Sequence, residues 1–173
     1  SPLSPYGFHK FYSENLCLEF SKIYSIPTAS LRIFSAYGPG LRRQVIWDIC
    51  QKILSQNRLT LQGTGQESRD FIHAVDIARA TEIVIHSAPM RGEVYNLANG
   101  EEWKISEIAE LVLRAMGVEY PINFDGMSTP GNPLRWQASI AKLQGLGFSP
   151  SINIEQGITT FCNWCRAEWQ GLE

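Results

Sequence analysis

Apolar and polar positions along this chain follow two periods, one typical of helices and one typical of strands. The helical period predicts helices over residues 5–24, 45–54 and 75–86, after 106, over 139–144 and from 153 to 169. Apolar runs predict strands over residues 29–34, 59–61, 92–97 and 120–124, and an extended piece over 69–73. Ser4, Ser106 and Asn153 are positioned to cap three of these helices. Because strands and helices alternate, the pattern predicts an α/β fold with at least part of its sheet parallel.

Tyr6 and Lys10 lie four residues apart near the start of the first predicted helix. With Ser4 as the cap and Pro5 as the first helical residue, the two side chains share one face, one turn apart. A free phenol loses its proton only near pH ~10, and a neighbouring ammonium group favours the phenolate. Such a pair can act as a general acid and base on a hydroxyl or carbonyl group. Any amphipathic helix can also carry this spacing, so the pair alone leaves a plain surface role open.

Composition excludes several classes of protein. Of the 173 residues, 44% are hydrophobic and 18% are charged, which is enough apolar material for a buried core. A net charge of -2 and a pI near 5.9 provide no basic surface, so we expect no nucleic-acid partner. No run approaches the ~20 apolar residues of a membrane span, so we expect no membrane partner either. The four cysteines do not make a disulfide framework, which is typical of a cytoplasmic protein.

Four segments follow one another in an order and at spacings that resemble a known family. They are Ser-Pro-Tyr-Gly-Phe-His-Lys at 4–10, Leu-Arg-Ile-Phe-Ser-Ala-Tyr-Gly-Pro-Gly at 31–40, Gly-Thr-Gly-Gln-Glu-Ser-Arg-Asp-Phe-Ile-His at 63–73 and Val-Tyr-Asn-Leu at 94–97. Together they resemble the extended short-chain dehydrogenase/reductase family, and within it the C-terminal half of NAD-dependent nucleotide-sugar epimerases and dehydratases. The resemblance covers nearly the whole chain.

The resemblance implies the second half of a Rossmann-like, doubly wound parallel sheet plus a smaller α/β substrate-binding domain. Residues 1–36 would be the C-terminal remnant of the NAD-binding domain with the Tyr-x-x-x-Lys helix. Residues 37–173 would mainly form the sugar-nucleotide-binding domain, with a return segment to the Rossmann part near 66–100.

The resemblance also implies roles for the first helix. Tyr6 would exchange a proton with a sugar hydroxyl, and Lys10 would bond the ribose of the nicotinamide cofactor, NAD or NADP. The family's glycine-rich dinucleotide loop has no match here, since no glycine pair has the third glycine and the strand-to-helix context. We therefore expect the main cofactor loop and a partner serine or threonine to lie upstream, and this chain to be inactive alone.

On the substrate side, the resemblance makes Arg69 a ligand of the nucleotide's diphosphate, which a guanidinium can grip with two hydrogen bonds. The alternative is a surface arginine paired with Asp70 or Glu67. Ser35 stands where many relatives have Asn to contact the sugar diphosphate. A hydroxyl there still donates one hydrogen bond.

A second departure lies at Thr129-Pro130-Gly131-Asn132, where the family often has Arg-Pro-Gly-Asp. Thr129 and Asn132 thus replace the charged pair that usually closes on the nucleotide. Asn132 remains a candidate ligand, and Arg135 is near enough to supply the missing charge. The alternative for Arg135 is the cap of a surface turn.

Other motifs have simpler interpretations. Cys162 and Cys165 form a C-x-x-C motif inside a predicted helix, without a second pair nearby in sequence, so we interpret them as core residues and predict no metal site. His73 is interpreted as structural, and Trp136, with the tryptophans of the last helix, is expected to pack in a core or an interface.

The prediction is therefore an NAD-dependent epimerase that acts on a nucleotide-diphosphate sugar, at C4 and through a keto-sugar intermediate. A 4,6-dehydratase or a reductase would share every residue named here. A noncatalytic sugar-nucleotide-binding module is the alternative from another class, and its binding would not depend on Tyr6. The resemblance also implies a homodimer formed through the helix that carries Tyr6.

Overall fold

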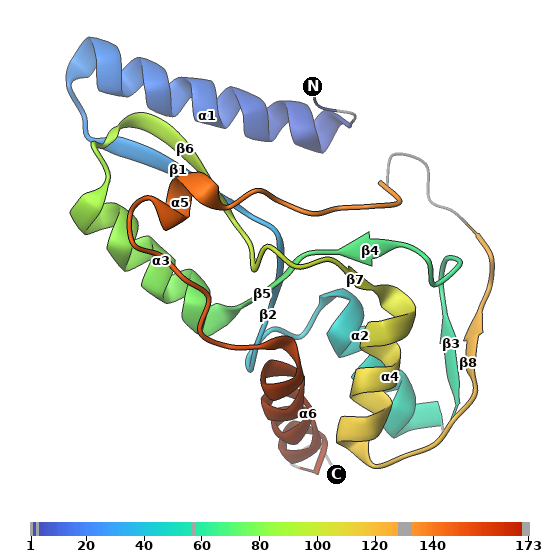
Figure 1. Ribbon diagram of the computed structural model, residues 1–173. Helices are drawn as coiled ribbons and strands as arrows, with labels where there is room; N and C mark the ends of the chain where they lie inside the picture. The colour runs from blue at the N-terminus through green and yellow to red at the C-terminus, as the bar shows by residue number, and fades with distance from the viewer. Residues whose placement is uncertain (1, 3, 57, 128–132, 171–173) are drawn as a thin grey trace.

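The computed structural model describes residues 2, 4–56, 58–127 and 133–170 (Figure 1). The elements are α1 (Pro5–Tyr24), β1 (Thr28–Ile33), β2 (Ser35–Tyr37), α2 (Gln44–Gln56), β3 (Leu59–Leu61), β4 (Ser68–Arg69), β5 (Phe71–His73), α3 (Ala74–Ser87), β6 (Arg91–Leu97), β7 (Trp103–Lys104), α4 (Ile105–Met116), β8 (Ile122–Phe124), α5 (Ala141–Gln144) and α6 (Ile154–Gln170). The predicted α/β class is thereby confirmed. Among the described residues, no helix combines the length and the apolar character needed to cross a membrane.

The part of the fold around α1 is a parallel strand pair between helices. β1 and β6 run parallel, with Ser30 opposite Val94 and Ile33 opposite Leu97. α1 packs on both strands, and α3 contacts β1. Figure 1 shows α1 and α3 on opposite sides of the pair. The predicted parallel pairing is confirmed, and both faces of the pair are covered, as is usual for parallel strands.

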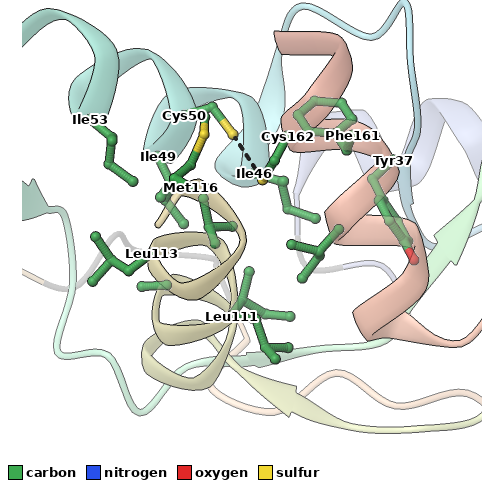
Figure 2. Packing of buried hydrophobic residues seen from close by; sticks show 14 of the residues in the cluster. Tyr37, Ile46, Ile49, Cys50, Ile53, Leu111, Leu113, Met116, Phe161 and Cys162 are labelled. Carbon is green, nitrogen blue, oxygen red and sulfur yellow. Dashed lines mark hydrogen bonds between the residues drawn. The ribbon is translucent and has the colours of Figure 1, made fainter. Parts of the chain in front are cut away.

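The second part of the fold surrounds three packed helices. β2 and β5 pair in parallel and connect this part to the first. α2, α4 and α6 pack against one another, while β3 pairs with β8 in parallel and β4 with β7 in antiparallel fashion. The largest hydrophobic cluster lies between the three helices (Figure 2). A smaller cluster joins α3 to β6 and to residues that follow α5.

The ends of α1 follow from its local sequence. The Ser4 Oγ accepts a hydrogen bond from the backbone N–H of Gly7 at 3.1 Å, and Pro5 occupies the first turn. At the other end, Ser25 adopts a left-handed conformation with a φ of 56°, and its N–H bonds to the carbonyl of Phe20. Both predicted ends of this helix are confirmed, because each is determined within a few residues.

The predicted cap of α4 is wrong. The helix begins at Ile105, so Ser106 lies inside it. The N–H of Ile105 donates to the carbonyl of Glu67 at 2.8 Å, and the N–H of Ser106 donates to that of Gly65 at 3.2 Å. The Glu107 carboxylate accepts from the N–H of Lys104 at 2.8 Å. Since distant carbonyls satisfy the first N–H groups of α4, the helix needs no serine cap.

The C-x-x-C cysteines lie in the core between α2 and α6. Cys162 and Cys165 are 0% and 1% exposed, which confirms their interpretation as core residues. Cys50 of α2 faces them, with its Sγ 3.9 Å from that of Cys162 (Figure 2). Hydrogen bonding to the neighbouring thiols, together with burial, raises the pKa of Cys50, so its thiol stays protonated. All the cysteines are free, and the described residues contain no group of three ligands placed to hold a metal ion.

Asp76 connects α3 to the segment that leads into α6. Its carboxylate is fully buried and accepts hydrogen bonds from the N–H groups of Ser151 and Ile152 and from the Ser151 hydroxyl, at 2.7 to 3.1 Å. Arg79 adds an ion pair at 2.8 Å. Burial alone would raise the pKa of Asp76, but these bonds outweigh it and lower that pKa. The ionised carboxylate therefore stabilises the fold.

Gly157 allows α6 to lie directly against Tyr37. A Cβ at this position would lie 2.1 Å from the Tyr37 Oη, and the Tyr37 side chain is buried and fixed in the core. We expect Gly157→Ala to lower the free energy of unfolding by about 1–3 kcal/mol, because overpacking forces Tyr37 or α6 to move. Urea denaturation of the full-length protein measures this change. Gly145→Ala is the control, since Gly145 has a helical φ of -61° and an added Cβ would meet its nearest neighbour at 3.4 Å. Equal losses for the two variants would contradict the expectation.

Candidate functional site

Tyr6 and Lys10 lie together on the outer surface of α1. The Tyr6 side chain is 70% exposed, and the Lys10 Nζ lies 5.4 Å from the centroid of the Tyr6 ring. An open hollow of about 700 Å³ adjoins Lys10 and is also lined by Phe11, Glu14 and Arg32, among others. The predicted one-turn spacing of the phenol and the ammonium is therefore present. A phenol and an ammonium that are both accessible can exchange protons and donate hydrogen bonds to a ligand.

α1 is attached to β1 by contacts that fix the position of this pair. Arg32 donates two hydrogen bonds to the Glu14 carboxylate, at 2.7 and 2.6 Å, and these bonds raise the pKa of Arg32. The Thr28 hydroxyl donates to the carbonyl of Cys17 at 2.7 Å. Beneath the helix, Gly92 has a φ of 86°, and a Cβ there would lie 2.7 Å from the Cα of Leu18. A side chain at residue 92 would therefore push α1 away from the strands.

Ser35 is the first residue of β2 and is separated from the end of β1 by Phe34 alone, so it lies at the carboxyl end of the parallel β1–β6 pair. The N–H of Phe34 donates to the carbonyl of Leu97, and that of Ser35 donates to the carbonyl of Asp70, both at 3.0 Å. Ser35 is also opposite Phe71 in the β2–β5 pair. Ligands of open α/β sheets bind at the carboxyl ends of the strands. The fold thus places Ser35 beside the Arg69-Asp70 segment, on the side where such ligands bind.

Arg69 is only 9% exposed, which excludes the alternative of a surface arginine. Its Nη1 donates to the carbonyls of Ser68, at 2.6 Å, and Pro133, at 2.9 Å. The guanidinium carbon lies 5.5 Å from the centroid of the Trp136 ring. Burial lowers the pKa of Arg69, and the nearby charge of Glu67 opposes this effect. Arg69 is thus a partly desolvated cation, held by backbone carbonyls and an aromatic ring.

Asp70, the next residue, points into the interior. Its carboxylate is fully buried and accepts from the N–H groups of Asn99, at 2.8 Å, and Ala138, at 3.2 Å. The N–H of Gly100 bonds to both of its oxygens. Burial raises the pKa of Asp70 in spite of these bonds. The side chain holds two loops, residues 99–100 and residue 138, against the end of β4.

Arg135 is paired with a carboxylate that the sequence did not indicate. Its Nε and Nη2 donate to the two oxygens of Glu102 at 2.8 and 2.6 Å, which is a bidentate pair. The Ser68 hydroxyl also donates to Glu102. The hydrogen bonds from Arg135 lower the pKa of Glu102 to about 2, so the pair is ionised at neutral pH. The alternative of a turn cap is wrong for Arg135. Thr129 and Asn132 lie outside the described residues.

Of the two places expected for Trp136, a core or an interface, the structure rules out the core of this chain, and the interface stays a prediction. It is 43% exposed and not in the core, and its ring meets that of Phe34 edge-on with centroids 5.7 Å apart. The hydrophobic pattern could not show this, because a large aromatic residue predicts burial in general. Its position directly after Arg135 and close to the Pro-Gly-Asn motif was the one available signal.

His73 has a structural role, as interpreted from the sequence. Its Nδ1 accepts from the N–H of Val75 at 3.2 Å and so caps α3, and its ring meets that of Tyr37 at 5.2 Å between centroids. The side chain is buried, and burial lowers its pKa. Its Nε2 has no hydrogen-bond partner among the described residues.

The structure therefore forms two groups of the predicted residues. Ser35, Arg69 and Arg135 lie in one connected network at the ends of β1 and β4, through Asp70 and Glu102. Tyr6 and Lys10 form the second group on α1, which is attached to the same strand, β1, by Glu14 and Arg32.

Comparisons with known proteins give one consistent result. The profile of the NAD dependent epimerase/dehydratase family matches residues 1–98. An uncharacterised UDP-glucose epimerase of Bacillus subtilis is 30% identical over 173 residues, which cover 99% of this chain and 54% of that protein. A dTDP-glucose 4,6-dehydratase of Escherichia coli is 29% identical over 95% of this chain and 49% of its own length.

A solved structure extends the likeness to the fold. The UDP-glucuronic acid 4-epimerase of Bacillus cereus, in complex with UDP-glucuronic acid and NAD, is 30% identical and has a TM-score of 0.89. The match covers 97% of this chain and 54% of that one. This chain thus spans about half the length of the relatives it matches. Because the family profile covers more than half of the chain and the parallel strands match such structures, this chain belongs to the NAD-dependent epimerase/dehydratase family.

Proposed function

We propose that the full-length protein is an NAD-dependent nucleotide-sugar epimerase that acts at C4 of the sugar. The observation that carries this proposal is the exposed pair of Tyr6 and Lys10 at the capped start of α1, with 5.4 Å between the ammonium and the ring. Epimerase relatives of similar sequence support the same activity. Of the functional residues of the full-length protein, this chain is proposed to contain the general acid and base and the residues that bind the diphosphate.

Tyr6 is the proposed acid and base. As the sugar 4-hydroxyl is oxidised to a ketone, the Tyr6 oxygen accepts the hydroxyl proton, and it returns the proton when the hydroxyl forms again on the other face. Bound NAD supplies the acceptor and donor of the hydride. The residues present here fit such a cofactor, because the Lys10 ammonium is exposed beside a hollow and can donate hydrogen bonds to ribose hydroxyls.

Arg69 and Ser35 are the proposed diphosphate ligands. A desolvated guanidinium binds phosphate more strongly than an exposed one, because little water competes for its N–H groups. Asn132 is proposed as a further ligand. Arg135 is proposed as another ligand of a phosphate. Because its Nε and Nη2 are already bonded to Glu102, its guanidinium would be shared between that carboxylate and the phosphate.

The organisation of the whole protein is part of the proposal. Residues 1–36 would complete the NAD-binding domain and residues 37–173 would mainly bind the sugar nucleotide, with a return near 66–100, in a cytoplasmic homodimer. In support, α1 has no buried residue, and all of its large apolar side chains except that of Leu18 are 44 to 70% exposed. They are Tyr6, Phe8, Phe11, Tyr12, Leu16, Phe20, Ile23 and Tyr24. A patch of this kind marks an interface, which the rest of the protein and a second copy would share.

The test is to incubate the full-length protein with NAD and, separately, UDP-glucose, UDP-glucuronic acid and dTDP-glucose, and to follow the sugar signals by proton NMR. We expect conversion to the 4-epimer, without net reduction of NAD. A 4-keto-6-deoxy product would instead establish the dehydratase, which the 29% identical Escherichia coli relative favours. Binding without turnover of any sugar would contradict the proposal in favour of a noncatalytic module. Light scattering of the same sample reports whether it is a dimer.

A further inference from the structure

The segment on both sides of Trp136 is anchored residue by residue. Before it, two backbone carbonyls accept hydrogen bonds from Arg69 and Ser68, and the Arg135 side chain donates to Glu102. After it, one side-chain donor and one backbone donor bond to other segments. The contacts are Pro133 O to Arg69 at 2.9 Å, Leu134 O to the N–H of Ser68 at 2.8 Å, Arg135 to Glu102 at 2.8 and 2.6 Å, Gln137 to Gly100 O at 2.9 Å, and Ala138 N–H to Asp70 at 3.2 Å. A ring on such a segment keeps its position without a core around it.

Trp136 uses this fixed position to contact Arg69. Its ring centroid lies 5.5 Å from the guanidinium carbon, within the range of a cation–π contact. Phe34 meets the same ring edge-on at 5.7 Å and limits its rotation. Three side chains from distant parts of the sequence thus form a short row, Phe34, Trp136 and Arg69.

The chemistry of this contact suits a residue that must bind an anion. Burial partly desolvates Arg69, which disfavours its charged form. The face of an aromatic ring offsets this loss without accepting a hydrogen bond from any guanidinium N–H group. A carboxylate in the same place would compensate too, but it would neutralise the charge and compete with phosphate. The neighbouring carboxylate, Glu102, is instead paired with Arg135 and Ser68.

We infer that Trp136 is a positioning residue, whose indole holds the Arg69 guanidinium in the orientation that binds the diphosphate of the nucleotide. This inference rests on the proposed function, in which Arg69 binds that diphosphate. It predicts that Trp136 affects the affinity for the phosphates and not the affinity for the nucleoside.

The experiment measures the Kd values of UDP and uridine by calorimetry, on the full-length protein and its Trp136 variants. We expect Trp136→Ala to raise the Kd of UDP roughly 3- to 30-fold, as loss of a cation–π contact predicts, and to leave that of uridine within about twofold. Trp136→Phe retains an aromatic face and should restore most of the UDP affinity. Trp169→Ala, near the end of α6, is the matched control and should change neither Kd. General damage to the fold would weaken UDP and uridine together.

A double-mutant cycle with Arg69→Ala separates the possible results. If Trp136 acts through Arg69, Trp136→Ala has no further effect on UDP in the Arg69→Ala background. An equal effect in both backgrounds would overturn the inference, because Trp136 would then contact the nucleotide directly. If Arg69→Ala weakens UDP and Trp136→Ala does not, the inference fails while the proposed function stands. A wild-type protein that binds UDP no better than uridine would overturn both.

Discussion

Replacing Tyr6 by phenylalanine should lower the turnover number of C4 epimerisation by about 10²- to 10⁴-fold in the full-length protein. A positioned general acid and base contributes a factor of this size, and phenylalanine cannot accept or return a proton. The variant should fold normally, since Tyr6 is 70% exposed on a helix that Ser4 caps. Initial rates of epimer formation, measured by NMR at saturating sugar nucleotide, give the turnover number.

Tyr24→Phe is the matched control, because Tyr24 lies at the other end of the same helix, away from the hollow beside Lys10, and is 61% exposed. It should retain the wild-type rate. Calorimetry should show that Tyr6→Phe still binds UDP, since the proposed phosphate ligands are on other elements. A Tyr6→Phe enzyme that keeps a third or more of the wild-type turnover number would show that another group transfers the proton.

The largest effect on stability is expected for Asp76→Ala, which should lower the free energy of unfolding by about 3–5 kcal/mol. Each buried N–H left without an acceptor costs about 1–3 kcal/mol, and the substitution removes the acceptor of Ser151 and Ile152. The Arg79 pair adds little, because that side chain is 43% exposed and can return to water. Urea denaturation followed by circular dichroism measures the loss. Asp48→Ala, at an exposed helical pair with Lys52, should cost no more than about 0.5 kcal/mol.

The same carboxylate predicts a pH dependence with a definite sign. The pKa of Asp76 is lower in the folded protein than the ordinary value near ~3.9, so its ionised form is favoured by folding. Its contribution is complete above about pH 5 and is lost as the pH falls through ~4 and below. The difference in stability between wild type and Asp76→Ala should therefore shrink between pH 6 and pH 3. A difference that grows on acidification would contradict the role given to the ionised carboxylate.

The sequence predicted those elements whose ends are determined locally. The bounds of α1 are correct because Ser4, Pro5 and Ser25 act within one turn of the helix ends. The start of α4 was wrong because the acceptors of its first N–H groups come from Gly65 and Glu67, some forty residues earlier. Periodicity describes which residues are apolar, and it contains no information on which distant carbonyl will meet a helix end.

The candidate site was predictable to a similar extent. Family motifs indicated Tyr6, Lys10, Ser35 and Arg69, and strand order then explains why Ser35 and Arg69 are close. Motifs could not show that Arg135 is paired with Glu102, or that Trp136 lies over Arg69, since both contacts join separate loops. The contact between Cys50 and Cys162 could not be predicted from the sequence either, because 112 positions separate the two residues.

Asp70 has a consequence for how this protein can change over evolution. It holds Asn99, Gly100 and Ala138 through their main-chain N–H groups, which every residue except proline provides. The loops at the mouth of the site can therefore exchange side chains while their backbones stay in place. Such exchanges can adapt the site to other sugars or bases without any change in the scaffold. One buried carboxylate thus keeps the shape of the loops constant while the side chains that determine selectivity vary.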